Sequence, residues 1–140
     1  MPMLSQKNIR IINHLDASIP VLGDEHLLTQ VFRNLLDNAI RYSPNGSGIT
    51  VSSKDASDIV VFAVEDEGTG IPRQHLKRIF ERFYRVDKER SRASGGTGLG
   101  LAICRNAIRE MGGDIRAESP PENRAKGSVF YFSLKKYKDV

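Results

Sequence analysis

A row of side-chain amides is predicted on one side of a helix that spans about residues 25–42. Gln30, Asn34 and Asn38 are spaced by four residues, so they share one face, and Asn38 falls inside its apolar sector. A half-buried amide needs a partner, because leaving it unsatisfied costs about 1–3 kcal/mol. Asn34 and Asn38 therefore either bond to backbone or to each other, or Asn38 offers its carbonyl oxygen to a hard cation. Mg²⁺ prefers such oxygen ligands and shares its shell with phosphates.

An aspartate follows the most apolar stretch of the chain. Asp66 comes directly after Ile59–Glu65 and opens the sequence Asp-Glu-Gly-Thr-Gly. An aspartate at a strand end can accept a hydrogen bond from an exocyclic amine such as that of adenine. Glycines at 68 and 70 let the backbone approach a flat ligand closely. The same pattern is also typical of an ordinary turn, so on its own it leaves both interpretations open.

A glycine-rich run, residues 94–102, leads into a predicted helix over about 98–111. Backbone of this kind at a helix N-terminus is suited to binding an anion. The run has neither Gly-x-Gly-x-x-Gly spacing nor a Gly-Lys-Ser/Thr ending, which disfavours the Rossmann and Walker A nucleotide sites. A phosphate site of another type is the remaining expectation.

Basic residues are concentrated between residues 73 and 92. This segment holds eight Lys or Arg residues and three acidic ones, a net +5, in a chain whose formal net charge is +4. A local basic stretch favours an anionic ligand over a nucleic-acid surface, although part of it, including Arg73, Lys77 and Arg78, is expected to be a solvated helix face. A triphosphate carries about four negative charges, more than one helix terminus offsets. A magnesium ion and one or two cations of the loop, which holds Lys88, Arg90 and Arg92, could supply the difference.

These residues require a scaffold of helices and strands, and the patterns predict a single α+β domain over residues 1–140. Besides the helix after Asp24, a second is expected from Pro72 and a third over about 98–111. Residues 7–22 could form edge strands, residues 85–97 a mobile loop, and residues 135–140 a frayed tail. The four clearest strands are expected at 49–54, 59–65, 114–118 and 128–134. The predicted result is a sheet of about five strands with three helices on one face and the other face partly open.

Several classes of protein are disfavoured by composition. No run of 18 apolar residues is present, and the first residues lack a signal-peptide pattern. Cys104 is the only cysteine, which excludes an internal disulfide and fits a reducing compartment. Its apolar helical context favours a small buried side chain over a reactive thiol.

The four chemistry-bearing segments together resemble the nucleotide-binding boxes of sensor histidine kinases. Gln30–Tyr42 resembles the asparagine box, Asp66–Gly70 the first glycine box, Phe80–Arg85 the phenylalanine box and Gly96–Leu101 the second glycine box. The likeness extends over about residues 7–135. It implies a Bergerat-type α/β sandwich, the fold shared with gyrase, Hsp90 and MutL, that binds ATP with Mg²⁺.

The resemblance also implies roles for individual residues. Asp66 would accept the adenine amine, Tyr42 would pack near the base, and Ile71 would line its pocket. Asn38 would bind magnesium with Asn34 beside it. The ATP-contacting positions implied in this way are Asn34, Asn38, Arg41, Tyr42, Asp66, Gly68, Gly70, Ile71, Arg85, Lys88, Arg90, Gly96, Thr97, Gly98, Leu99, Gly100 and Leu101.

Three further expectations come from the same resemblance. Arg41 stands where the family often has lysine and would reach phosphate as a cation. Residues 85–97 would form the ATP lid, with Phe80 and Phe83 anchoring its base. Hydrolytic relatives carry a glutamate general base one helical turn before the magnesium asparagine, and here that place is Asn34, whose amide has no usable basicity.

The phosphoryl acceptor is expected to lie elsewhere. In the family it is a histidine on a separate dimerisation domain, and His14, His26 and His75 lack that His-Glu/Asp-x-x-x-Pro-like context. The expected function is therefore phosphoryl donation from Mg-ATP to that domain, and through it to a response regulator in a phosphorelay. The isolated chain is not expected to phosphorylate itself. The expected location is the cytoplasmic portion of a membrane-bound sensor kinase. No nucleic-acid partner is expected. The alternative is a free-standing anti-sigma-type kinase or nucleotide-gated binding module.

Overall fold

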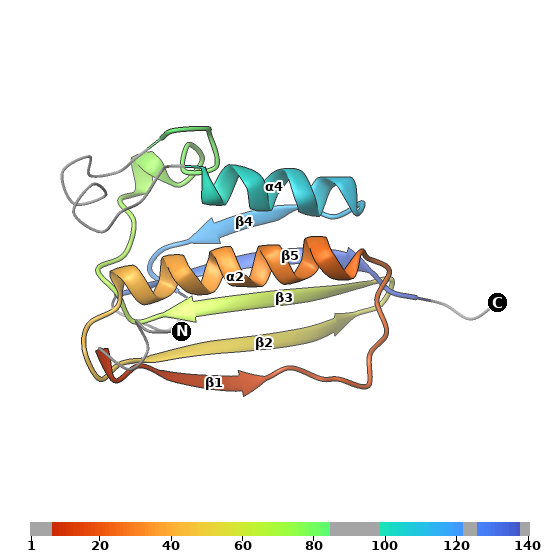
Figure 1. Cartoon of the computed structure of the whole chain (residues 1–140), viewed down its shortest axis with the longest axis horizontal. Coiled ribbons are helices and arrows are strands. Elements are labelled where there is room, and N and C mark those ends of the chain that lie inside the picture. The colour runs from red at the N-terminus through yellow and green to blue at the C-terminus, as the bar shows by residue number, and fades with distance from the viewer. Residues whose placement is uncertain (1–6, 85–98, 122–125, 138–140) are drawn as a thin grey trace.

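The computed structural model describes residues 7–84, 99–121 and 126–137, and the elements named below belong to this part of the chain (Figure 1). In chain order they are β1 (Arg10–His14), α2 (Glu25–Tyr42), β2 (Gly48–Ala56), β3 (Ile59–Asp66), the 3-10 turn η1 (Arg73–His75), α4 (Gly100–Glu110), β4 (Ile115–Glu118) and β5 (Ser128–Lys135).

The five strands form one mixed sheet in the order β1-β2-β3-β5-β4. β1 pairs with β2 in parallel, and the other neighbouring strands are antiparallel. The predicted five-stranded α+β architecture is thus confirmed, and β3, which contains the most apolar stretch of the chain, is the central strand. Of the residues 7–22 only β1 forms an edge strand, while Val21 makes an isolated bridge with Lys136.

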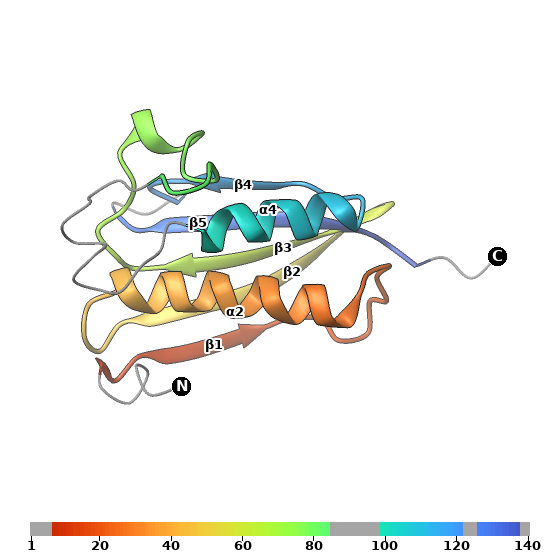
Figure 2. The ribbon, with the colours of Figure 1, turned by 45° about the horizontal axis from the view of Figure 1, so that its top comes forward.

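Both described α-helices cover the same face of this sheet. α2 and α4 lie side by side, α2 over the middle strands and α4 nearer β4 and β5 (Figures 1 and 2). The core between the layers includes three aromatic rings, with Phe132 stacked on Phe62 at 4.9 Å and Phe32 edge-on to both. Neither helix combines the length and apolar character that crossing a bilayer requires.

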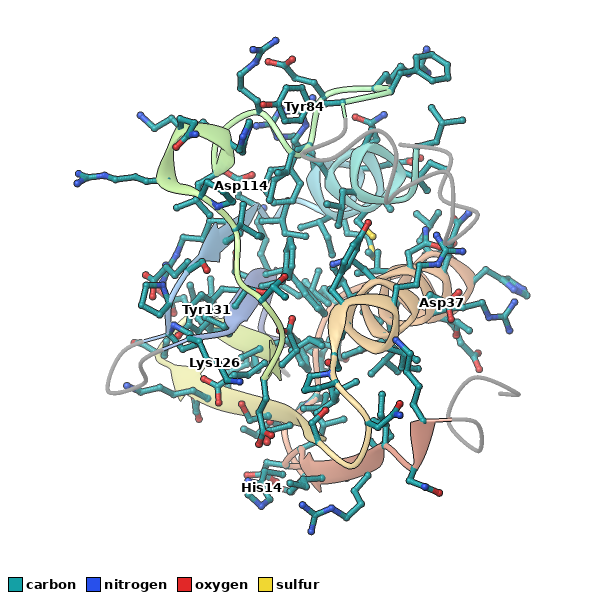
Figure 3. The ribbon with its side chains drawn as sticks, turned by 90° about the vertical axis from the view of Figure 1, so that its left-hand side faces the viewer. His14, Asp37, Tyr84, Asp114, Lys126 and Tyr131 are labelled. Carbon is teal, nitrogen blue, oxygen red and sulfur yellow. The ribbon has the colours of Figure 1, made fainter. Side chains whose placement is uncertain are left out.

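The other face of the sheet is partly open, as expected. Along β3, buried Val60, Phe62 and Val64 alternate with half-buried residues that point to the opposite side. Figure 3, seen from the end of the sheet, places Asp37 on the helix side and Tyr131 on this second face. The Arg116 guanidinium lies over the Tyr131 ring at 4.3 Å.

Both ends of α2 are fixed by side chains. At its N-terminus the Asp24 carboxylate caps the helix by accepting from the backbone amides of His26 (2.8 Å) and Leu27 (3.1 Å). At its C-terminus the Lys7 ammonium donates to the carbonyls of Ile40 (2.8 Å), Arg41 (2.9 Å) and Ser43 (3.3 Å). A cation there also complements the helix dipole.

The helix predicted from Pro72 is wrong, so the described residues hold two α-helices where three were expected. Only η1 is helical in residues 72–84, and most backbone bonds after it join residues three apart, such as Arg78 to His75 and Tyr84 to Glu81. These separate short turns break the i, i+4 alignment that an apolar helical face requires. Ile79 and Phe80 are buried as a result, whereas Phe83, at φ 64°, is 69% exposed.

The expected frayed tail also differs in its first three residues. Lys135 ends β5 and accepts from the Leu22 amide at 2.8 Å. The amides of Lys136 and Tyr137 donate to the carbonyls of Asp58 (2.9 Å) and Pro20 (3.0 Å). Backbone pairing to residues 20–22 and to Asp58 therefore holds this stretch, and residues 138–140 lie outside the described part.

Candidate functional site

Three predicted site segments meet at one end of the sheet. β3 ends there, α2 ends there and α4 begins there, at the left-hand end of Figure 1. The antiparallel register also brings the start of β5 to the end of β3, because Asp66 pairs with Ser128. This end gathers a carboxylate, a glycine turn, amides and a helix N-terminus.

The Asp66 carboxylate is the most buried charged group at this end, with 2% exposure. Its Oδ1 accepts from the Gly68 amide at 2.8 Å, and its Oδ2 accepts from the Ser128 hydroxyl at 2.8 Å. Desolvation by burial raises the pKa of Asp66 above its ordinary value, and these hydrogen bonds offset part of that rise. Both oxygens are held in fixed directions, which suits a carboxylate that recognises a donor group.

The raised pKa of Asp66 gives a pH-dependent stability effect. The folded protein keeps this proton to higher pH than the unfolded chain does, so the contribution of Asp66 to stability falls as pH rises above about 4. Asp66→Asn cannot ionise. We expect its free energy of unfolding, relative to that of the unsubstituted protein, to increase between pH 4 and pH 7. Urea denaturation at several pH values measures this difference, and a difference that stays constant or decreases would contradict it.

The glycine turn packs directly on the end of α2. A Cβ atom at Gly68 would lie 2.3 Å from the Tyr42 carbonyl oxygen, so no larger residue fits without a backbone shift. Gly70 has φ 84°, a conformation that favours glycine. Tyr42 and Gly68, both predicted from sequence, are thus brought together, and Ile71 packs against the core just beyond.

A second wall of the site comes from the start of β5, and the sequence reasoning missed it. Ser128 bonds Asp66, and Gly127, at φ 101°, lies so close that a Cβ would be 2.3 Å from the Asp66 carbonyl oxygen. Ser119, at the end of β4, donates to the Gly127 carbonyl at 2.6 Å and accepts from the Ile71 amide at 2.8 Å. The available signal was the Gly-Ser pair that opens the last strand.

The amide row faces the N-terminus of α4. The Asn34 side-chain amide donates to the Gly100 carbonyl at 3.5 Å, which links α2 to the glycine-rich segment. Asn38 is half-buried, and its side chain makes no hydrogen bond within the described part of the chain. The Asn34 interaction matches one alternative for that residue, bonding to backbone, while the carbonyl oxygen of Asn38 remains available.

Arg41 and Cys104 place two buried polar groups on the helices beside the site. The Nε atom of Arg41 is buried without a hydrogen-bond partner among the described residues. Burial raises the pKa of the Cys104 thiol to about 12, with a smaller opposing effect from Asn34, so the thiol is inert at neutral pH, as expected.

The remaining predicted positions divide into two groups. Leu99 and Gly100 begin α4, and Leu101 packs against the core. Phe80 anchors the segment by an edge-on contact with Phe130 at 6.1 Å, but the exposed Phe83 does not share that role. The positions that lie outside the described residues are Arg85, Lys88, Arg90, Gly96, Thr97 and Gly98.

Comparisons with known proteins match most of the chain. Residues 23–138 match the model of the family described as histidine kinase-, DNA gyrase B-, and HSP90-like ATPase. The sensor-like histidine kinase SenX3 of Mycolicibacterium smegmatis is 48% identical over 94% of this chain and 33% of its own length. The sensor histidine kinase WalK of Bacillus subtilis is 40% identical over 94% of this chain and 22% of its own.

A solved structure gives the same result for the fold. The catalytic domain of histidine kinase ThkA superposes with a TM-score of 0.80 at 34% identity, covering 96% of this chain and 85% of that one. The chain therefore spans between about a fifth and a third of the curated relatives named above, but most of a catalytic domain solved by itself.

Proposed function

Because the chain belongs to the histidine kinase-, DNA gyrase B- and HSP90-like ATPase family, we propose that it is the catalytic ATP-binding domain of a sensor histidine kinase. It binds Mg-ATP and donates the γ-phosphoryl group to a histidine on a separate dimerisation domain. The observation that carries this proposal is the buried Asp66 carboxylate, oriented by Gly68 and Ser128 at the end of β3.

Adenine recognition is assigned to the turn after β3. An oriented carboxylate oxygen accepts from the adenine amine, and the buried setting strengthens that bond. Gly68 and Gly70 keep the backbone close to the base, and Tyr42 and Ile71 pack at its edges. The adenine base would thereby be selected by one charged acceptor, with apolar groups at its edges.

The triphosphate is assigned to the opposite side of the site. Leu99, Gly100 and Leu101 form the start of α4, where the helix dipole favours an anion. Arg41 supplies a cation from α2. Further contacts would come from residues that precede this helix in sequence, namely Arg85, Lys88, Arg90, Gly96, Thr97 and Gly98.

The donors of this site fit a magnesium ion that is bound by oxygen atoms of both the protein and the phosphates. The described residues contain no cluster of three or more His, Cys, Asp or Glu side chains suited to hold a metal by itself. The Asn38 carbonyl oxygen is a neutral ligand, with Asn34 beside it, so most of the opposing charge must come from phosphate. When bound, the ion neutralises charge on the phosphates.

Transfer to an outside histidine is favoured over hydrolysis. In the transfer, a bond forms between the acceptor imidazole nitrogen and the γ-phosphorus while the bond to the β–γ bridging oxygen breaks, and ADP leaves. Asn34 has no usable basicity near pH 7, so no general base for water stands in the amide row. The acceptor domain would be another part of the parent protein, and the response regulator would be a separate partner protein.

Calorimetry with Asn38→Ala tests this proposal. We expect the unsubstituted chain to bind Mg-ATP in the micromolar-to-millimolar range, about −4 to −8 kcal/mol, and to bind less tightly when EDTA removes magnesium. Asn38→Ala should lose most of this magnesium dependence, because it removes the side-chain oxygen ligand. Asn106→Ala, on the exposed side of α4, is the control and should behave like the unsubstituted protein.

Radiolabelled ATP tests the second half of the proposal. The isolated chain should neither label itself nor release phosphate quickly, because the acceptor histidine is on another domain and Asn34 activates water poorly. Absence of Mg-ATP binding, or rapid hydrolysis by the chain alone, would refute the proposed function.

A further inference from the structure

The turn after β3 is tied to the β4–β5 connection by one hydroxyl group. Ser119 Oγ accepts from the Ile71 amide at 2.8 Å and donates to the Gly127 carbonyl at 2.6 Å. These two bonds join residues that are 48 and 8 positions away from Ser119 in sequence. We call Ser119, Ile71 and Gly127 the Ser119 clasp.

The backbones joined by the clasp are also in direct contact. A Cβ at Gly70 would lie 2.9 Å from Ser119 Oγ and 3.2 Å from the Gly127 carbonyl oxygen. A Cβ at Gly127 would lie 2.3 Å from the Asp66 carbonyl oxygen. The two glycines therefore allow an approach that side chains would prevent, and the hydroxyl of Ser119 satisfies polar groups on both segments.

The clasp fixes both sides of the proposed adenine pocket. Gly127 immediately precedes Ser128, whose hydroxyl donates to Asp66 Oδ2. Ile71 immediately follows Gly70 in the turn whose first residue is Asp66. Holding the Ile71 amide and the Gly127 carbonyl on one oxygen therefore sets the spacing between the carboxylate, its serine partner and the apolar wall.

On the basis of the proposed function, we infer that Ser119 is a positioning residue for adenine recognition, acting through Ile71 and Gly127 without contacting the nucleotide. Removing its hydroxyl leaves the Ile71 amide without its acceptor and the Gly127 carbonyl without its donor. The turn then widens, and the base loses its fit, whereas the phosphate contacts on α2 and α4 are on separate elements and remain.

The experiment compares two ligands that share phosphates but differ in the base. Mg-ATP and Mg-tripolyphosphate affinities are measured for the unsubstituted chain, Ser119→Ala, Ser119→Thr and Ser133→Ala. Ser133 Oγ accepts from the Asp114 amide at 3.3 Å at the far end of the same hairpin, so Ser133→Ala is a matched serine control. Amide hydrogen exchange of Ile71, followed by NMR, reports the clasp directly.

For Ser119→Ala we expect about a five- to tenfold loss of ATP affinity, which is within the range expected when part-buried hydrogen bonds are lost. Tripolyphosphate affinity should change less than about twofold, and Ile71 exchange should accelerate. Ser119→Thr keeps the hydroxyl and should restore both values. Ser133→Ala should leave ATP affinity and Ile71 exchange unchanged.

Other outcomes overturn the inference in distinguishable ways. Equal losses for ATP and tripolyphosphate would mean a general loss of structure, and faster Ile71 exchange with unchanged ATP affinity would mean a merely structural hydrogen bond. If the unsubstituted chain binds no ATP at all, the proposed function fails first, and the role of Ser119 in recognition fails with it.

Discussion

Replacing Asp66 by asparagine is expected to weaken Mg-ATP binding by roughly ten- to a hundredfold, the largest effect on affinity that we predict. The asparagine oxygen can still accept from the Gly68 amide, so the turn is retained. Its NH₂ group replaces the Oδ2 atom and faces the adenine amine as a second donor. The base therefore loses an acceptor and meets an uncompensated donor, and calorimetry measures the loss.

A matched carboxylate shows whether this effect is local. Asp55, at the opposite end of the sheet, pairs with Lys136 at 2.8 Å on the surface, so Asp55→Asn should leave ATP affinity unchanged. Asp66→Asn should also reduce discrimination between ATP and GTP. An Asp66→Asn protein that binds ATP as tightly as the unsubstituted chain would remove adenine recognition from this carboxylate.

Replacing Phe132 by alanine is expected to cost about 3–5 kcal/mol of unfolding free energy, the largest stability effect. Phe132 is 1% exposed and lies in the middle of β5, with Phe62 stacked at 4.9 Å and Phe32 edge-on at 5.3 Å. Truncation removes these ring contacts and leaves a cavity between the sheet and α2. Urea denaturation with an unchanged m-value measures the loss as a shift of the midpoint.

Phe83→Ala is the control substitution for that measurement, because it removes the same kind of ring from the surface. Its ring is 69% exposed, so Phe83→Ala should change the unfolding free energy by no more than about 0.5 kcal/mol. Similar losses for Phe83→Ala and Phe132→Ala would contradict the assigned core. A small loss at Phe132 alone would mean that the cavity collapses around the missing ring.

Local sequence signals were sufficient for most of the architecture. Asp24 and the 3.6-residue spacing of Val31, Leu35 and Ala39 predict α2, and the structure buries those three residues and bonds Asp24 to the first turn. The strand β3 was equally clear because its residues are apolar on both faces, and it lies in the middle of the sheet. These signals depend only on residues near one another in sequence, which is why they could be recognised without the fold.

The features that could not be predicted from the sequence depend on contacts between distant segments. Ser119 and Ser128 are ordinary polar residues in sequence and become part of the site only because β5 pairs with β3. The 72–84 segment has the composition of an amphipathic helix, but the left-handed Phe83 and the bonds between residues three apart divide it into short turns. Tertiary packing of Phe80 against Phe130 outweighs helix propensity there.

The three carbonyls held by Lys7 have a practical consequence for choosing domain boundaries. The family match begins at residue 23, but a polypeptide cut there would lack Lys7 and β1. It would leave the end of α2, next to Tyr42, without its ammonium cap, and it would turn β2 into an unprotected sheet edge open to pairing with other chains. The smallest unit suited to recombinant work therefore begins before Lys7.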